Sequence, residues 1–369
     1  MESNKFDVIV IGAGVAGCCV ARELCRWDLK VLVLEAGDDI ACGATRANSA
    51  IVHAGYDPVP GTNKAKYNVA GCKAYPRWAS ELNFPYENNG SLILAFSEEE
   101  MQAVRDLYER GLENGVERLS VIDHDKVLEL EPNVSEDVQG ALFAESGGIC
   151  DPYLVALAAI ENAVNNGAKV LLNHPVKEIG IGKNCGMWKC SCEDGSVYKA
   201  NALINAAGVF SDEINNMVSE DKFKITARKG EYILYDPHMG KSFKRTLFQT
   251  PTAAGKGILV SPTIHGNLFV GPNSIPQDSK TDKSTVPENL SEIIKQAQKT
   301  WPDASMRGAI TNFAGLRSTG DRGDFVIGQA KDAPGFFNIA CFESPGLTSA
   351  PAVAEDLSKQ VAEYLKADK

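Results

Sequence analysis

Three glycines near the N-terminus, Gly12, Gly14 and Gly17, have the spacing G-x-G-x-x-G. They lie between an apolar run that predicts a strand, residues 7–11, and a pattern that predicts a helix, residues 15–27. In this setting glycines let the backbone approach a pyrophosphate at the helix N-terminus. Glu35 closes the next predicted strand, where a carboxylate accepts hydrogen bonds from ribose hydroxyls. The pattern predicts a dinucleotide site and leaves NAD and FAD open.

Two later segments favour FAD over NAD. Residues 203–212 predict a strand that runs through a turn of small residues, around Ala207 and Gly208, into a helix. This arrangement resembles the second cofactor-contacting segment of the glutathione-reductase-type FAD domains. Residues 343–350 place Gly346 at the start of the last predicted helix, whose exposed N–H groups could stabilise negative charge on a reduced isoalloxazine ring. With the glycine motif, these segments predict FAD as the cofactor.

Motifs over nearly the whole chain resemble the FAD-dependent glycerol-3-phosphate dehydrogenases and oxidases, within the broader D-amino-acid-oxidase-like group. The short bacterial glycerol-3-phosphate oxidases are the most alike. Besides the glycine motif, the resemblance is carried by ANSAIVHAGYDP at 47–58, RKGEY at 228–232, GKGILVSP at 255–262, FAGLR at 313–317 and SPGLT at 344–348. The L-2-hydroxyglutarate oxidases share a similar Asn-Ser-x-x-x-His-Ala-Gly segment. Oxidation of a 2-hydroxy acid therefore stays open as an alternative.

The resemblance implies a set of site residues. Ser49 and His53 are expected to face the substrate and the flavin, and Ser344 to lie close to the substrate. Lys256 and Arg317 are expected to hold an anionic group. The expected contacts to FAD come from Gly12, Gly14, Val15, Ala16, Gly17, Glu35, Ala36, Thr45, Asn48, Ser49, Val176, Ala207, Gly208, Gly346, Leu347 and Thr348.

Oxidising a secondary alcohol with a flavin needs a hydride acceptor, a base for the hydroxyl proton and a clamp for the substrate. His53 is the candidate base because an unperturbed imidazole has a pKa near ~6.5. Arg317 can bind phosphate or carboxylate through two parallel hydrogen bonds, and Lys256 lies in a glycine-flanked loop suited to an anion. Two cations slightly favour a phosphate over a single carboxylate. Without the resemblance, a packed histidine, a surface arginine and a loop lysine are the ordinary alternatives.

The elements that must position these residues alternate between strand and helix patterns in the N-terminal third and near the C-terminus. Between about residues 224 and 270 the pattern changes to short strands separated by Gly and Pro. The fold class expected is therefore α/β, a Rossmann-like FAD-binding domain of glutathione-reductase type with an inserted antiparallel-sheet substrate domain. We assign 1–84, 145–222 and 313–369 to the discontinuous FAD-binding domain. The substrate domain takes 85–144 and 223–312.

Composition limits the partners. With 48 acidic and 37 basic side chains the net charge is −11, which argues against nucleic acid, because phosphate backbones need a basic field. Ten cysteines without a C-x-x-C pair indicate free thiols in a reducing compartment, and we assign no metal. No apolar run reaches the ~18 residues of a spanning helix. We expect a cytoplasmic protein, with peripheral contact to the inner membrane face left open.

The expected partners are a small anionic alcohol and an electron acceptor. Many look-alikes continue past the position of Lys369 into a cysteine-rich module that binds an iron–sulfur cluster. The acceptor therefore stays open among oxygen, a quinone and a partner protein. A non-catalytic FAD-binding module is the third hypothesis, and His53, Lys256 and Arg317 argue against it, because a structural flavin would not need them.

Overall fold

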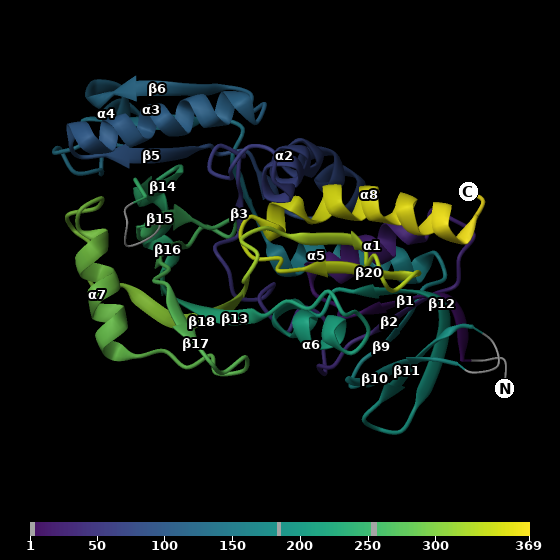
Figure 1. Cartoon of the computed structure of the whole chain (residues 1–369). Coiled ribbons are helices and arrows are strands. Elements are labelled where there is room, and N and C mark those ends of the chain that lie inside the picture. The colour runs from purple at the N-terminus through teal and green to yellow at the C-terminus, as the bar shows by residue number, and fades with distance from the viewer. Residues whose placement is uncertain (1–3, 183–185, 252–256) are drawn as a thin grey trace.

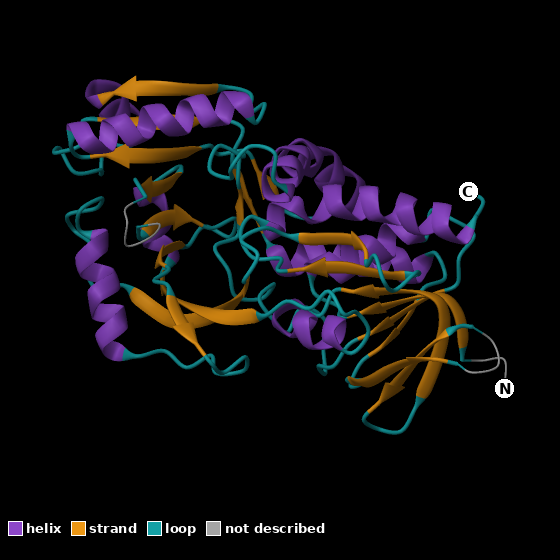
Figure 2. Cartoon of the chain, viewed as in Figure 1, coloured by secondary structure: helices purple, strands orange, loops and turns teal. Residues whose placement is uncertain are grey.

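The computed structural model describes residues 4–182, 186–251 and 257–369. Its elements form two large sheets, one at the right and one at the left of Figure 1, with helices packed on each (Figures 1 and 2). Both ends of the chain lie on the side of the first sheet. A third, three-stranded sheet contains β3 (Ile51–Val52), β4 (Tyr86–Glu87) and β8 (Gly148–Cys150). Its strands come from parts of the sequence that lie between strands of the two large sheets.

The first sheet has eight strands in the order β10-β11-β12-β1-β2-β9, with β20 beside β12 and β19 beside β20. Strands β9, β2, β1, β12 and β20 run parallel and form the Rossmann-like core. The bounds are β1 Lys5–Ile11, β2 Val31–Leu34, β9 Lys169–Leu171, β10 Val176–Ile181, β11 Trp188–Cys192, β12 Val197–Asn205, β19 Val326–Gln329 and β20 Phe336–Ala340. Their buried runs of Val, Ile and Leu are typical of strands covered on both faces.

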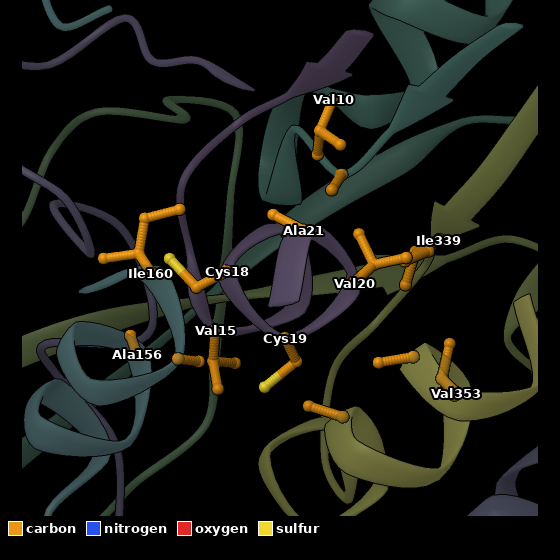
Figure 3. Close-up of a cluster of buried hydrophobic side chains, with 14 of the residues drawn as sticks. Val10, Val15, Cys18, Cys19, Val20, Ala21, Ala156, Ile160, Ile339 and Val353 are labelled. Atoms are coloured by element: carbon orange, nitrogen blue, oxygen red, sulfur yellow. The ribbon is translucent and has the colours of Figure 1, made fainter. Parts of the chain in front are cut away.

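The helices that pack on this sheet are α1 (Val15–Leu24), α2 (Asn63–Leu82), α5 (Pro152–Asn165), α6 (Ser211–Asn216) and α8 (Gly346–Leu365), with a short 3₁₀ turn η1 (Gly208–Phe210). Figure 3 shows α1 end-on, between Ile160 of α5 and Val353 of α8. Cys18 and Cys19 are fully buried on α1, and burial raises the pKa of both thiols. They act there as small apolar groups.

The second sheet has nine strands in the order β17-β13-β16-β15-β14-β5-β7-β6, with β18 beside β13. Its pairings are antiparallel except for β14 with β5. The bounds are β5 Ser91–Ala95, β6 Leu119–Asp123, β7 Gly140–Ala144, β13 Ile225–Tyr235, β14 Thr246–Gln249, β15 Leu259–Pro262, β16 Leu268–Gly271, β17 Ile275–Gln277 and β18 Ala309–Gly320. The accompanying helices are α3 (Glu98–Glu113), α4 (His124–Leu130), α7 (Pro287–Ala297) and the 3₁₀ turn η2 (Pro237–Ser242).

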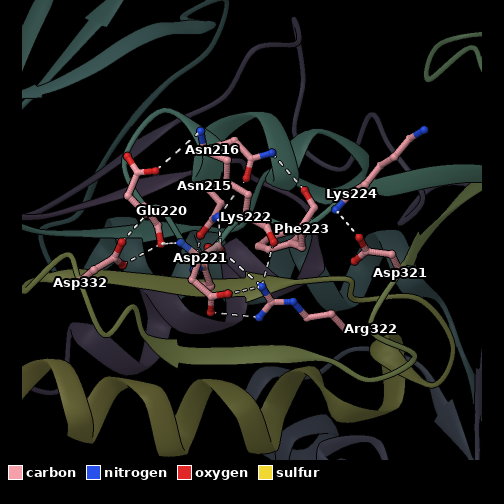
Figure 4. Close-up of polar contacts among 12 residues, drawn as sticks. Asn215, Asn216, Glu220, Asp221, Lys222, Phe223, Lys224, Asp321, Arg322 and Asp332 are labelled. Carbon is pink, nitrogen blue, oxygen red and sulfur yellow. Dashed lines mark hydrogen bonds and ion pairs between the residues drawn. The ribbon is translucent and has the colours of Figure 1, made fainter.

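The chain crosses between the two sheets before β13 and after β18, and polar contacts hold the two crossings together (Figure 4). The Arg322 guanidinium pairs with the Asp221 carboxylate, and its Nη2 also donates to the Lys222 carbonyl oxygen at 2.9 Å. The Lys224 backbone N–H donates to the Asp321 carboxylate at 3.1 Å. These contacts fix where the chain enters β13 and where it leaves β18.

The predicted fold class, an α/β Rossmann-like FAD domain with a second and mostly antiparallel sheet, is confirmed. The domain boundaries stay a prediction. Strand β18 lies wholly in the second sheet, so the expected return to the FAD domain at residue 313 falls inside a strand. Within the described residues, the helices are all too short or too polar to cross a membrane.

Candidate active site

The glycine turn after β1 approaches the end of β12 closely. Gly12 has φ +103°, and a Cβ at this position would lie 2.5 Å from the Ala206 carbonyl oxygen. A Cβ on Gly17 would lie 1.9 Å from the Gly12 carbonyl oxygen, so the first turn of α1 packs directly on the loop. The turn that follows β12 contains Ala207 and Gly208, the latter with φ +58°. The structure therefore brings the glycine turn and the second predicted cofactor-contacting segment together, and the close approach requires glycine at Gly12 and Gly17.

Helix α1 begins without a side-chain cap and has no acidic residue in its first turn. Helices α2, α3, α4 and α5 each begin with a capping side chain, as α5 does with Asp151. The Val15 N–H donates to Thr45 Oγ1 at 2.9 Å, and Ala16 and Gly17 follow in the first turn. N–H groups at this position have no intrahelical partner and favour an anion. The N-terminus of α1 thus fits a pyrophosphate.

Glu35 follows β2 at its carboxyl end. Its Oε2 accepts from the Ala13 N–H at 2.6 Å and its Oε1 from the Gly37 N–H at 2.8 Å, which leaves further acceptor sites on both oxygens. The His174 N–H donates to the Glu35 carbonyl oxygen at 2.8 Å, which brings the start of β10, with Val176, beside β2. Ala36 is exposed at the same place. This is the end of the sheet where a ribose is expected.

The segment that carries Asn48 and Ser49 is a tight turn. The Asn48 amide donates to the carbonyl oxygens of Ala44 and Thr45, and its Oδ1 accepts from the Ala50 N–H at 2.7 Å. The Asn48 side chain therefore stabilises the turn. Ser49 is partly exposed, with its Oγ 3.3 Å from the hydroxyl of Tyr232 on β13.

Helix α8 also begins without a side-chain cap or an acidic first turn, at Gly346 and Leu347. The buried Thr348 hydroxyl accepts from the His53 N–H at 2.9 Å and lies 3.3 Å from the Ile51 carbonyl oxygen. Asn68 donates from its amide to the His53 carbonyl oxygen at 2.6 Å. The backbone of His53 is therefore held from both sides beside a helix N-terminus suited to negative charge.

The His53 side chain is half-buried at the edge of this arrangement. Its Nε2 lies 3.5 Å from the Oγ of Ser344, at the outer limit of a hydrogen bond, and Ser344 itself is exposed. The ring lies 5.7 Å from that of Phe248 on β14, between centroids. The structure brings the predicted base and the predicted substrate-side serine together.

Arg317 lies on β18, opposite Arg228 of β13. Its Nη1 and Nη2 both lie 3.4 Å from the Asn273 carbonyl oxygen, and its Nη2 is over the bare backbone of Gly230. A guanidinium held by one carbonyl at this distance keeps most of its donors for another acceptor. Lys256, the second predicted cation, lies outside the described residues.

Three contributors were missed as individual residues. Tyr232 lies in the RKGEY motif, but no role was predicted for it from the sequence. No role was predicted for Asn273 or Asn68 either. Asn273 also exchanges two hydrogen bonds with the buried Glu231 of β13, which fixes the carbonyl that meets Arg317. The signal for Tyr232 was its position in a motif with Arg228. For both asparagines the role depends on tertiary contacts.

The fold, with a glycine turn at the N-terminus of α1, agrees with a flavoprotein, and the family model of the FAD-dependent oxidoreductases matches residues 7–360. The chain belongs to this family, and its cofactor is FAD.

Within this family, the chain is similar to proteins named for glycerol 3-phosphate or glycerophosphate. A glycerol 3-phosphate dehydrogenase of Caloramator mitchellensis is 43% identical over 98% of this chain and 75% of its own. A glycerol 3-phosphate oxidase of Mycoplasma genitalium is 32% identical over 95% of this chain and 93% of its own. The solved L-alpha-glycerophosphate oxidase of Mycoplasma pneumoniae, with FAD bound, superimposes with a TM-score of 0.91 at 28% identity, covering 99% of this chain and 96% of that one.

Proposed function

We propose that this chain oxidises sn-glycerol 3-phosphate to dihydroxyacetone phosphate. The observation that carries the proposal is the position of residues 47–53 between two parts of the site. On one side His53 meets Thr348 and Ser344 at the N-terminus of α8. On the other side Ser49 meets β13, the strand paired with the one that carries Arg317. This segment thus carries the base at one end and lies against the strand pair that carries the anion clamp at the other. The relatives described above support the same substrate.

In this proposal Arg317 binds the phosphate and fixes the orientation of the substrate. His53 takes the proton of the C2 hydroxyl through its imidazole, which the contacts of its backbone with Thr348 and Asn68 hold in place. Bound FAD supplies the acceptor for the hydride that leaves C2. Ser344 lies close enough to the His53 Nε2 to orient the ring. Lys256 adds a second positive charge for the phosphate.

The FAD contacts proposed for this chain come from several separate segments. Glu35, Ala36 and Val176 would receive the adenosine half, and Gly12 to Gly17 with Thr45 the pyrophosphate. Ala207, Gly208, Asn48 and Ser49 would line the riboflavin half. Gly346, Leu347 and Thr348 present the N-terminus of α8 to the ring.

The test is anaerobic reduction of the purified, FAD-loaded protein, followed through the visible absorbance of the oxidised flavin. We expect sn-glycerol 3-phosphate to bleach the flavin at a rate within the ~1 to 1000 per second that is usual for enzymes. Glycerol, which lacks the anion, should be far slower. If L-2-hydroxyglutarate bleached the flavin faster than glycerol 3-phosphate, the substrate assignment would be wrong. Mixing the reduced protein with aerated buffer then tests oxygen as the acceptor.

A further inference from the structure

One face of the β13–β18 pair is organised in three successive levels. Alternate residues of a strand share a face, and residues paired across strands share it too. The three pairs on this face are Arg228 with Arg317, Gly230 with Gly315, and Tyr232 with Phe313. Along the strands, a pair of arginines is therefore followed by a pair of glycines and then by a pair of aromatic residues.

Because Gly230 and Gly315 have no side chains, other groups can approach the backbone of the two strands closely. A Cβ on Gly230 would lie 2.7 Å from Nη2 of Arg317, so the guanidinium leans over this glycine towards the aromatic pair. A Cβ on Gly315 would lie 1.8 Å from the Ala47 carbonyl oxygen. The chain segment that begins at Ala47 thus lies against the strands, and two residues later Ser49 reaches Tyr232.

The ring of Tyr232 has a fixed position. It stacks on Phe313 with centroids 4.7 Å apart and planes at 7°, and its edge meets Phe269 at 5.9 Å. Tyr232 is 3% exposed, and its hydroxyl lies 3.3 Å from the Oγ of Ser49. A phenol packed in this way cannot turn its hydroxyl elsewhere, because the ring would have to leave both aromatic neighbours. It therefore holds one side of the Ser49 hydroxyl.

We propose that Tyr232 is a positioning residue, which orients the Ser49 hydroxyl to bind the terminal hydroxyl of the substrate, the group remote from the phosphate. This rests on the proposed function. The Arg317 guanidinium lies over Gly230, two residues along β13 from Tyr232, and Cα atoms two residues apart on a strand are separated by about 7 Å. A three-carbon chain with a phosphate at one end and a hydroxyl at the other is of similar length to this spacing along the strand.

The chemistry of the pair selects a hydroxyl over a second carboxylate. Ser49 and Tyr232 are neutral and each can donate or accept, which suits a hydroxyl. The neighbouring cation on β13, Lys229, belongs to the opposite face, where its Nζ lies 3.2 Å from Asp282 and 2.9 Å from the Ser284 carbonyl oxygen. A dicarboxylic hydroxy acid would place its second carboxylate against the two neutral hydroxyls of Ser49 and Tyr232. Lys229 could not neutralise that charge, because it lies on the opposite face.

The experiment compares two substrates in five proteins. Glycerol 3-phosphate carries the terminal hydroxyl, whereas propane-1,2-diol 1-phosphate of the same configuration at C2 has a methyl group in its place. For the wild type we expect kcat/KM for the methyl analogue to be lower by roughly 100-fold or more, because a site built to bind a hydroxyl rejects the analogue that lacks it. Tyr232→Phe should lower kcat/KM for glycerol 3-phosphate by about 10-fold. It should leave the analogue unchanged.

Three further proteins, the Ser49→Ala variant, its combination with Tyr232→Phe and a control variant, separate positioning from folding. Ser49→Ala should show the same selective loss, and adding Tyr232→Phe to it should cost nothing more, because Tyr232 acts through Ser49. Tyr235→Phe is the matched control, since it removes the hydroxyl of another buried tyrosine of β13, which binds the Ser305 carbonyl oxygen at 2.9 Å. This control should keep wild-type values for both substrates. The dissociation constant of dihydroxyacetone phosphate, followed by perturbation of the flavin spectrum, should rise only in the Ser49 and Tyr232 variants.

The outcomes are distinguishable. If glycerol 3-phosphate fails to reduce the wild-type flavin, the proposed function falls and the inference with it. If the wild type is reduced but Tyr232→Phe lowers kcat/KM equally for both substrates, or for neither, only the role of Tyr232 is overturned. A tenfold loss in Tyr235→Phe would also overturn it, because loss of any buried hydroxyl of β13 would then give the same effect.

Discussion

At the scale of the residue, the backbone and the side chain of His53 make different contacts. The backbone binds Thr348 and Asn68, whereas the ring faces Ser344. His53→Asn should therefore keep the local fold and lose the base. We expect anaerobic flavin reduction by glycerol 3-phosphate to slow by roughly 100-fold or more, within the ~10²–10⁴ of a positioned base. Stopped-flow reduction of a fully FAD-loaded variant measures this.

The control for His53→Asn is His238→Asn, at an exposed histidine whose Nδ1 lies 2.7 Å from the Asp236 carboxylate. It should reduce at the wild-type rate. The wild-type rate should also rise with pH through a single ionisation, and the His53 variant should lose this dependence. A His53→Asn protein that is reduced as fast as wild type would make His53 a structural residue.

Arg317 should act on binding. Arg317→Met removes the charge while keeping a long apolar chain, and we expect KM for glycerol 3-phosphate to rise by roughly 10- to 100-fold, since a hydrogen bond to a charged group contributes about 1.5 to 3 kcal/mol. FAD content should hardly change. Arg105→Met on α3, which removes a surface ion pair with Glu98, is the control. Unchanged KM in Arg317→Met would place the anion clamp elsewhere.

Residue types predicted part of this site and not the rest. Glycine spacing and a carboxylate at a strand end point to a dinucleotide because backbone geometry demands those types locally. The structure places Glu35 and Gly12 accordingly. The work of Tyr232 and Asn273 depends on which strand lies opposite which, and register is set by tertiary packing. The register between β13 and β18 cannot be predicted from the local sequence pattern of one chain.

At the scale of the element, the first turn of α1 can be tested through Gly14. A Cβ there would lie 3.3 Å from Thr45 Oγ1, so Gly14→Val should fold but should crowd the backbone that approaches the pyrophosphate. We expect a lower ratio of FAD to protein after reconstitution. Gly180→Val on β10, where a Cβ meets nothing within 4 Å, should keep full FAD. Equal FAD content in both variants would contradict the assigned role of this turn.

Elements with a strong local signal were predicted closely. Helix α8 begins at Gly346, as predicted. Helix α5 begins with Asp151 and Pro152, an N-cap and a first helical residue that are typical of a helix start. Helix α7 has a weak start signal in the sequence, because its N-cap, Val286, is not a capping residue. Its apolar spacing, Leu290, Ile293, Ile294 and Ala297, was nevertheless a helical signal. Strand β11 has the alternating pattern of a strand, because Trp188, Cys190 and Cys192 are buried and the residues between them are partly exposed.

At the scale of the whole molecule, segments far apart in the sequence meet at the cofactor site. Helix α1 lies against α8, and Gly12 lies against the end of β12. Sequence patterns predicted the two kinds of sheet, but not how the chain crosses between them before β13 and after β18. That crossing depends on long-range contacts such as Arg322 with Asp221. A ligand that contacts all these segments should bind only the folded chain.

FAD should therefore raise the melting temperature in proportion to the logarithm of its concentration. At about 1000 times the dissociation constant, the gain is about 4 kcal/mol. An unfolding entropy of about 2 cal/mol/K per residue makes this roughly 5 °C for a chain of this length. Circular dichroism of the apoprotein titrated with FAD measures the shift. FMN, which lacks the adenosine half, should raise it far less, because it cannot reach Glu35. If FMN matched FAD, the adenosine half would contribute nothing and the assignment of Glu35 would be wrong.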